Sequence, residues 1–155
     1  MFVGRYEIKL DAKNRVIVPQ KLREAREAPG AMHSEFYLTP GNEGCIYVFT
    51  PQGWEDLMNQ FGATQAKADE SLRRLQRKVA ANTVPCSCDA QGRIVIPAEF
   101  RRHAGLKRNV LWVGAVSRAE IWDVERWQEI QSREVVGGSE DLRIATDAGF
   151  ALPGS

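Results

Sequence analysis

Two aspartate–arginine pairs with the same internal spacing are the residues of this sequence best suited to chemistry. Asp11 precedes Arg15 by four positions, and Asp89 precedes Arg93 by four positions. A guanidinium group can make two parallel hydrogen bonds to a phosphate or to the O6 and N7 atoms of guanine. An Asp-x-x-x-Arg motif can also be an ion pair that braces a turn. The sequence leaves both interpretations open.

The segment around each pair occurs twice in the chain. Residues 11–19 read Asp-Ala-Lys-Asn-Arg-Val-Ile-Val-Pro, and residues 89–97, offset by 78 positions, read Asp-Ala-Gln-Gly-Arg-Ile-Val-Ile-Pro. Arg23 recurs as Arg101 at the same offset. Self-similarity of this kind indicates one supersecondary unit that is built twice.

Cysteine offers a second kind of chemistry, through Cys45, Cys86 and Cys88. An odd number of cysteines without a signal peptide argues against a disulfide framework. The Cys-Ser-Cys run suggests zinc, but a closed zinc site needs about four ligands and the other candidates lack finger spacing. By the repeat offset, Cys86 and Cys88 correspond to Ile8 and Leu10, which share one face of a strand. We therefore expect small buried hydrophobes, with zinc as the alternative.

Histidine gives little support to catalysis or to metal binding. His33 and His103 are the two histidines, and neither belongs to a recognisable catalytic or metal-binding motif. The repeated residues are turn formers and not an acid–base pair. We therefore predict a protein that is not an enzyme and that holds no metal and no cofactor.

Strand and helix signals surround both motifs in the same order. Residues 6–10 and 15–18 read as strands around a turn, which predicts a hairpin. Asn14 and its counterpart Gly92 are residue types that accept a left-handed backbone in such a turn. The further predicted elements are proline-initiated helices at 20–28 and 98–104, strand pairs at 36–39 with 44–49 and 110–116 with 119–122, and helices at about 51–61 and 124–135.

A basic helix is predicted between the copies, at about residues 65–82. Its apolar face consists of Ala68, Leu72, Leu75 and Val79, and its cationic face of Arg73, Arg74, Arg77 and Lys78. The cationic face is either solvated or in contact with phosphate groups. We favour the solvated interpretation.

Length and composition predict one globular domain. The 155 residues are 43% apolar and carry a net charge of +1. We predict a mainly β protein with short helices (α+β), in which repeats at about 1–62 and 84–131 form a single domain over residues 1–135. Residues 136–155 lack periodicity and are expected to form a flexible tail. No stretch approaches the roughly 18 continuous apolar residues of a spanning helix, so we expect a soluble cytoplasmic protein.

The chain resembles the MraZ proteins, which are tandem-repeat members of the AbrB-like swapped-hairpin superfamily. The resemblance covers about residues 1–130 and rests on the paired Asp-x-x-x-Arg motifs, the opening Met-Phe-x-Gly-x-Tyr, Gly-Arg-Ile-x-Ile-Pro at 92–97, Ala-Gly-Leu at 104–106 and Glu-Ile-Trp at 120–122. It implies a pseudo-twofold swapped-hairpin barrel. One departure is Asn14, which replaces the usual glycine of the first motif, and the segment after Val135 is unmatched.

The resemblance also implies a function. Family members are bacterial transcriptional regulators of the division and cell-wall gene cluster that includes their own gene, and they form rings that bind direct repeats in promoter DNA. The implied partners are double-stranded DNA and further copies of this chain, in the cytoplasm at the nucleoid, without a membrane or a small-molecule substrate. Carried over to this sequence, the DNA-binding residues are Asp11, Lys13, Asn14, Arg15, Asp89, Gln91, Gly92 and Arg93.

The charge balance is compatible with this mechanism only if binding is local and multivalent. A net charge of +1 is too small for attraction by the whole surface. Several weak contacts presented by an oligomer can add up to tight binding, and direct DNA repeats favour a head-to-tail assembly that closes into a ring. The alternative function is a protein-interaction module, an antitoxin-like partner binder without DNA specificity.

Overall fold

The computed structural model describes residues 2–25, 28–64, 70–133 and 143. The chain divides into two compact units, Met1–Val124 and Glu125–Ser155. Residues 65–69 of the predicted connecting helix, and the predicted tail apart from residue 143, lie outside the described residues. A single domain over residues 1–135 stays a prediction.

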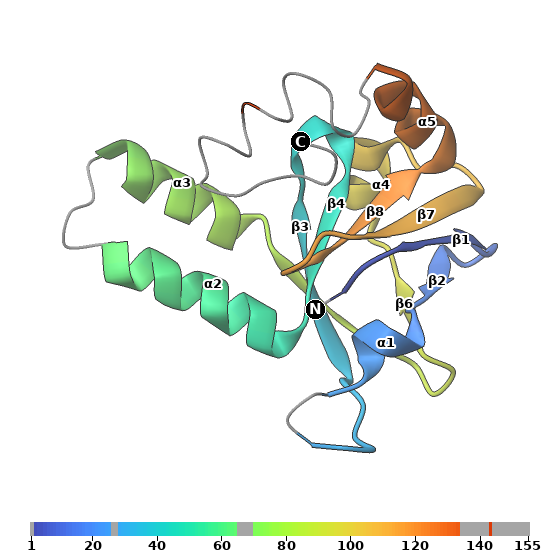
Figure 1. Ribbon diagram of the computed structural model, residues 1–155, viewed down its shortest axis with the longest axis horizontal. Coiled ribbons are helices and arrows are strands. Elements are labelled where there is room, and N and C mark those ends of the chain that lie inside the picture. Colours follow the sequence, from blue (N-terminus) through green and yellow to red (C-terminus); the bar gives the residue numbers. More distant parts are fainter. Residues whose placement is uncertain (1, 26–27, 65–69, 134–142, 144–155) are drawn as a thin grey trace. The chain divides into compact units, whose positions relative to one another are not determined.

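The fold is α+β, as predicted (Figure 1). The elements in chain order are β1 (Arg5–Lys9), β2 (Arg15–Ile17), α1 (Gln20–Arg23), β3 (Glu35–Pro40), a 3-10 turn η1 (Asn42–Gly44), β4 (Ile46–Phe49), α2 (Pro51–Thr64), α3 (Glu70–Ala81), β5 (Val84–Ser87), β6 (Arg93–Val95), α4 (Ala98–Ala104), β7 (Asn109–Gly114), β8 (Ala119–Asp123) and α5 (Val124–Arg133).

The helices after the two motifs differ in length. α4 coincides with its prediction, and Gly105 caps it in the left-handed conformation, at φ 58°. α1 is shorter than the helix predicted at 20–28 and ends at Arg23. The reason is that Glu24 takes an extended backbone, with φ −66° and ψ 126°, and forms a β-bridge with Met32.

The larger sheet exchanges strands between the two copies. Its order is β1-β7-β8-β4-β3-β5, and all neighbours are antiparallel. The pairs β3–β4 and β7–β8 are the second hairpins predicted for each copy. β1 of the first copy pairs with β7 of the second, while β5 of the second copy pairs with β3 of the first.

The prediction of a local hairpin around each motif is wrong in its pairing. The turn forms, but β1 leaves it for the larger sheet and β2 pairs with β6 of the other copy. This second, two-stranded sheet, the β2–β6 ribbon, places Val16 directly opposite its repeat equivalent Ile94. Both side chains are almost fully buried, because each short copy can cover its apolar strand face only with the other copy. The exchange agrees with the swapped hairpins that the family resemblance implies.

One hydrophobic core is shared by the two copies. Its fully buried large side chains include Phe36, Leu38, Ile46 and Val48 from the first copy and Ile94, Ile96, Phe100, Val110, Trp112 and Ile121 from the second. Cys86 is buried in this core, and Cys88 is partly buried against it together with Ile8 and Leu10. The prediction of small buried hydrophobes is confirmed for Cys86 and only in part for Cys88. Burial raises the pKa of Cys86 to about 11 and that of Cys45 to about 12.

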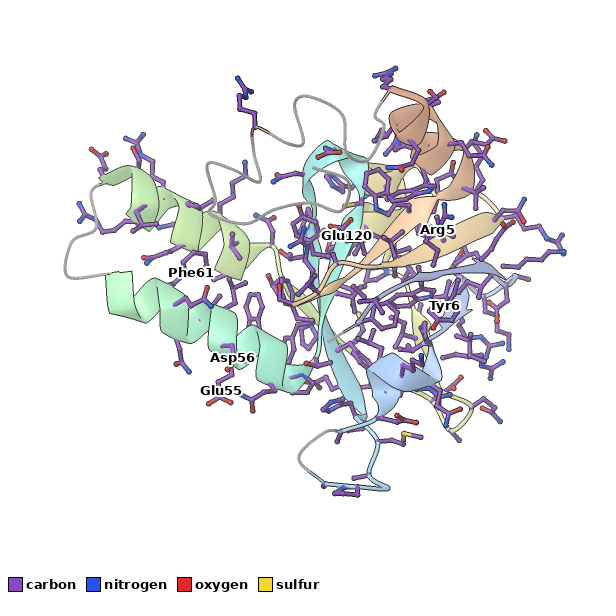
Figure 2. The ribbon with its side chains drawn as sticks, viewed as in Figure 1. Arg5, Tyr6, Glu55, Asp56, Phe61 and Glu120 are labelled. Carbon is purple, nitrogen blue, oxygen red and sulfur yellow. The ribbon has the colours of Figure 1, made fainter. Side chains whose placement is uncertain are left out.

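Helices α2 and α3 form a pair that extends from the larger sheet (Figure 1). Trp54 of α2 stacks on Tyr37 of β3, with ring centroids 5.6 Å apart, and lies 5.8 Å from Phe49 of β4. Gln76 Nε2 of α3 donates to the carbonyl of Phe61 in α2 at 3.1 Å. Phe61 lies on the helix α2 (Figure 2). An aromatic contact therefore anchors α2 to the sheet, and α3 is attached to α2.

The second unit contains most of α5. Within this helix, Ser132 Oγ donates to the carbonyl of Glu129 at 2.7 Å. No helix in the described parts of the two units is long and apolar enough to cross a lipid bilayer.

Candidate functional site

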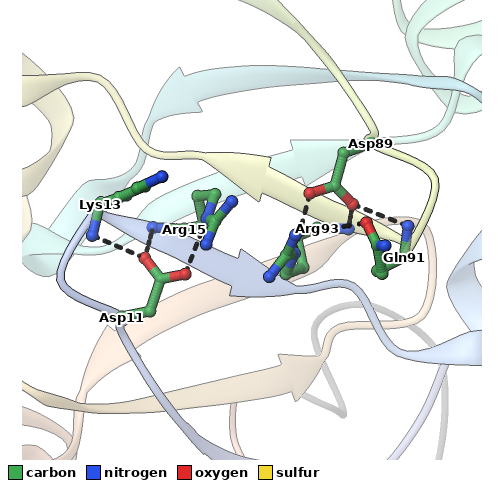
Figure 3. Close-up of polar contacts among 6 residues, drawn as sticks. All are labelled: Asp11, Lys13, Arg15, Asp89, Gln91 and Arg93. Carbon is green, nitrogen blue, oxygen red and sulfur yellow. Dashed lines mark hydrogen bonds and ion pairs between the residues drawn. The ribbon is translucent and has the colours of Figure 1, made fainter.

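The first loop is organised by the carboxylate of Asp11 (Figure 3). Oδ1 accepts hydrogen bonds from the backbone N–H groups of Lys13 and Arg15, at 2.9 and 2.8 Å, and Oδ2 accepts from Arg15 Nε at 2.7 Å. The Asn14 N–H donates to the Asp11 carbonyl at 2.9 Å. Asn14 has φ 60°, the left-handed conformation predicted for it. The spacing of four residues is therefore the length of this turn.

The second loop repeats the same contacts. Asp89 Oδ1 accepts from the N–H groups of Gln91 and Arg93, at 3.0 and 2.9 Å, and Oδ2 accepts from Arg93 Nε at 2.8 Å. Gly92 is again left-handed, at φ 77°. One contact is additional, because Arg93 Nη2 donates to the Gln91 side chain at 3.2 Å. The two loops thus share one design at Asp and Arg.

The geometry makes the two interpretations of the motif compatible with each other. In both loops Asp binds the Nε atom of Arg, at the inner edge of the guanidinium group. The Nη edge of Arg15 has no hydrogen-bond partner among the described residues. Both arginine side chains are partly exposed. Each Asp therefore orients its arginine while leaving donors for an external phosphate or base edge.

Both carboxylates are held in the ionised form. The backbone N–H of Arg15 is the largest cause that lowers the pKa of Asp11, assisted by the Arg15 side chain and the Lys13 N–H, while desolvation opposes the shift. The pKa of Asp89 is lowered by the equivalent groups, first the Arg93 N–H. Hydrogen bonds to a charged carboxylate favour its ionised state. Both carboxylates are consequently ionised at neutral pH and can accept these hydrogen bonds.

The β2–β6 ribbon fixes the position of one loop relative to the other. The two loops lie at opposite ends of the ribbon, with Arg15 and Arg93 between them (Figure 3). The Val18 N–H donates to the Gly92 carbonyl at 2.8 Å, and the Ile96 N–H donates to the Asn14 carbonyl at 2.9 Å. Each copy therefore holds the loop of the other copy by a backbone hydrogen bond. All eight predicted site residues lie in or next to this one ribbon.

Sequence reasoning gave no role to the arginine that recurs after each proline. Arg23 Nε donates to the carbonyl of Val18 at 3.0 Å, and Arg101 Nε donates to the carbonyl of Ile96 at 3.1 Å. The guanidinium of Arg23 also covers Gly92, since a Cβ atom placed on this glycine would lie 2.6 Å from Arg23 Cζ. The recurrence of this arginine at the repeat offset is the sequence signal that could have indicated a structural role.

The predicted apolar face of α3 is only partly confirmed. Leu75, expected to pack, is 48% exposed in α3. Arg74 forms an exposed ion pair with Glu70 one turn earlier in the helix. Exposed pairs of this kind contribute little to stability. The observed exposure is typical of a solvated helix face.

The histidines and cysteines do not assemble a metal site within the described residues. His103 Nε2 lies 2.9 Å from the carbonyl oxygen of Gly41. His33 lies edge-on to Phe36, with ring centroids 6.1 Å apart. Each histidine therefore contacts a neighbouring residue of the fold, a backbone carbonyl for His103 and an aromatic ring for His33.

Comparison with known proteins places the chain in a family. The sequence model of the family described as "MraZ protein, putative antitoxin-like" matches residues 1–78 and again residues 79–141, so the second match begins at the repeat offset of 78 positions. The match extends past Val135, so the expectation that the family resemblance ends there is wrong for residues 136–141. The protein named Transcriptional regulator MraZ of Lachnoclostridium phytofermentans is 38% identical over 128 residues, which cover 83% of this chain and 85% of the relative.

Two further relatives carry the same name. The protein of Saccharopolyspora erythraea is 42% identical over 128 residues, again 83% of this chain and 85% of the relative. The protein of Thermoanaerobacter sp. is 35% identical over 150 residues, which cover 93% of this chain and all of the relative. These relatives are named as regulators and not as enzymes. The chain belongs to the MraZ family.

Proposed function

We propose that this protein is a sequence-specific DNA-binding transcriptional regulator and that its two Asp-x-x-x-Arg loops contact double-stranded DNA. The observation that carries the proposal is the β2–β6 ribbon, which holds Arg15 and Arg93 between the two loops (Figure 3). A two-stranded ribbon fits the major groove, where arginine can pair with guanine. The names of the relatives support regulation of transcription as the purpose of this contact.

The proposed DNA-binding residues have three different roles: contact with DNA, orientation of the arginines and formation of the turn. Arg15 and Arg93 supply donors to phosphate or guanine, and Asp11 and Asp89 orient them. Lys13 and Gln91 supply backbone N–H groups to the turn and present their own side chains at an exposed position. Asn14 and Gly92 supply the left-handed backbone.

The proposed target is promoter DNA with direct repeats upstream of the chain's own gene, within the division and cell-wall cluster. The proposed active form is a homo-oligomer, in which a head-to-tail interface closes into a ring. The net charge of +1 supports a need for several protomers, since one protomer offers few phosphate contacts. Residues 1–135 act as one domain in this proposal, in the cytoplasm at the nucleoid.

A gel-shift titration on the region upstream of the gene tests the proposal. The wild-type chain should shift this fragment in the presence of excess scrambled DNA of the same length. The double variant Arg15→Ala/Arg93→Ala should lose most of that affinity while retaining its fold and its assembly. Arg118→Ala is the matched control, because Arg118 is also a partly exposed arginine paired with a carboxylate, that of Glu120, but lies outside the ribbon.

The same titration separates the alternative function. A protein-interaction module without DNA specificity would bind the upstream and scrambled fragments equally, or neither of them. Equal binding to both would contradict the proposal, as would unchanged affinity in the double variant.

A further inference from the structure

The outer face of the β2–β6 ribbon carries two exposed aliphatic side chains beside the two arginines. Successive residues of a strand point to opposite faces. Val16 and Ile94 point into the core, so their neighbours Arg15, Ile17, Arg93 and Val95 share the outer face. Ile17 is 46% exposed and Val95 is 55% exposed.

The two aliphatic residues are repeat equivalents, and each one stands beside an arginine of the other copy. The register places Ile17 opposite Arg93 and Arg15 opposite Val95. Directly opposed residues of an antiparallel pair have Cβ atoms about 4.5–5.5 Å apart. A single exposed aliphatic side chain needs no explanation. Two of them at the same repeat position, at the centre of the proposed DNA-contacting face, suggest a shared role.

We propose that Ile17 and Val95 contact the C5-methyl groups of thymines that adjoin the bases or phosphates contacted by Arg93 and Arg15. Thymine is the base that presents a methyl group on the major-groove edge, and apolar side chains recognise it there. The flanking arginines favour DNA over an apolar protein surface as the occupant of this face, because each Asp binds only the Nε edge of its arginine and apolar atoms would offer no acceptors to the remaining guanidinium donors. This inference rests on the proposed function and adds a base preference to it.

Removal of the thymine methyl group alone tests the inference. The fragment upstream of the gene is amplified once with thymidine triphosphate and once with deoxyuridine triphosphate, and the wild-type chain is titrated against both products. Uracil keeps the pairing and the O4 acceptor and lacks only the methyl group. The wild-type affinity should fall by on the order of fourfold for each methyl group that Ile17 or Val95 would otherwise cover, the factor expected for burial of one carbon group.

The variants Ile17→Ala and Val95→Ala show whether these residues make the contact. Each should bind the thymine fragment more weakly, and the double variant should bind the thymine and uracil fragments with nearly equal affinity. Val95→Thr keeps the β-branched shape and provides a second test if an alanine variant is poorly folded. Val3→Ala is the control, since Val3 is 57% exposed but lies outside the ribbon, and it should keep the wild-type ratio.

Three outcomes are distinguishable. Equal wild-type binding to both fragments would overturn the inference and leave the proposed function standing. A uracil penalty that persists undiminished in the double variant would also overturn it, because another group would then contact the methyl. Failure of the wild type to bind either fragment would contradict the proposed function itself and the inference with it.

Discussion

The first and second motif loops are equal in their Asp–Arg contacts and unequal at two of the three positions between these residues. Lys13 and Asn14 in the first loop become Gln91 and Gly92 in the second. At the first of these positions the backbone N–H supports the turn in both loops, and in the second loop the Gln91 side chain also accepts a hydrogen bond from Arg93. The next position must be left-handed in both loops. The comparison teaches that Asp and Arg make the contacts that the two loops share, while the residues between them meet requirements that differ between the loops.

Gly92 has a constraint that the left-handed backbone does not explain. Asparagine meets the backbone requirement, as Asn14 shows at φ 60°. A side chain at Gly92 would also displace the guanidinium of Arg23, which packs there from the other copy. Glycine in the second loop is therefore required by space as well as by conformation.

The largest expected effect comes from separating the two copies. A fragment of residues 1–61 lacks β7 and β6, the partners of β1 and β2, and it lacks half of the shared core. It should not unfold as a cooperative monomer, because it cannot cover its apolar strand faces. Thermal unfolding followed by circular dichroism, with the full chain as control, measures this. A cooperatively folded monomeric fragment would show that each copy folds independently.

The next largest effect is expected when the left-handed residues of the two loops, Asn14 and Gly92, are exchanged. Gly92→Asn should lower the free energy of unfolding by about 1–3 kcal/mol, because Arg23 must give up its packing and its bond to Val18. Asn14→Gly should change it by less than about 1 kcal/mol. In an Arg23→Ala background the Gly92→Asn penalty should shrink. Equal penalties for both exchanges, measured by urea unfolding, would remove the asymmetry between the loops.

The larger features of the fold follow from local sequence signals. The repeat predicts the left-handed residues, α4 and the burial of Cys86 and Cys88. The pairings β3–β4 and β7–β8 follow as well, but those of β1, β2, β5 and β6 do not, because a turn signal shows where the chain reverses and not which strand supplies the hydrogen-bond partners. The contact of Arg23 with Gly92 joins residues far apart in the sequence and has no local signature. The prediction for Leu75 is wrong because helix periodicity predicts a face and not whether another element covers it.

A smaller effect concerns acid stability and should be the same in both loops. The folded pKa values of Asp11 and Asp89 are lowered, so the stabilisation is present above the unfolded value near 3.8 and is lost as pH falls through the folded pKa. Asp11→Asn and Asp89→Asn should therefore be less stable than wild type at neutral pH and should approach it in acid. Urea midpoints measured from pH 7 down to pH 2 test this. A pH-independent difference would contradict the role given to the charge.

The smallest effect is expected at the cationic face of α3. Arg77→Glu and Lys78→Glu together should weaken DNA binding by a few-fold at most at physiological ionic strength, because exposed charges away from the ribbon act through screened attraction. Anisotropy titrations with the upstream fragment measure the change. Complete loss of binding by a folded variant would make this helix a primary site.

The most direct test of the account is the salt dependence of DNA affinity for Arg15→Ala and Arg93→Ala taken singly. Because the two loops share their Asp–Arg contacts, each variant should lose affinity for the upstream fragment by a similar factor while it remains folded. If the contacts are to phosphate, the slope of log K against log salt should fall by about one in each variant. If they are to guanine, discrimination against an altered base should shrink by about 1–3 kcal/mol instead. Unchanged affinity and slope in both variants, or a loss confined to one loop, would contradict the claim that two equivalent loops bind DNA.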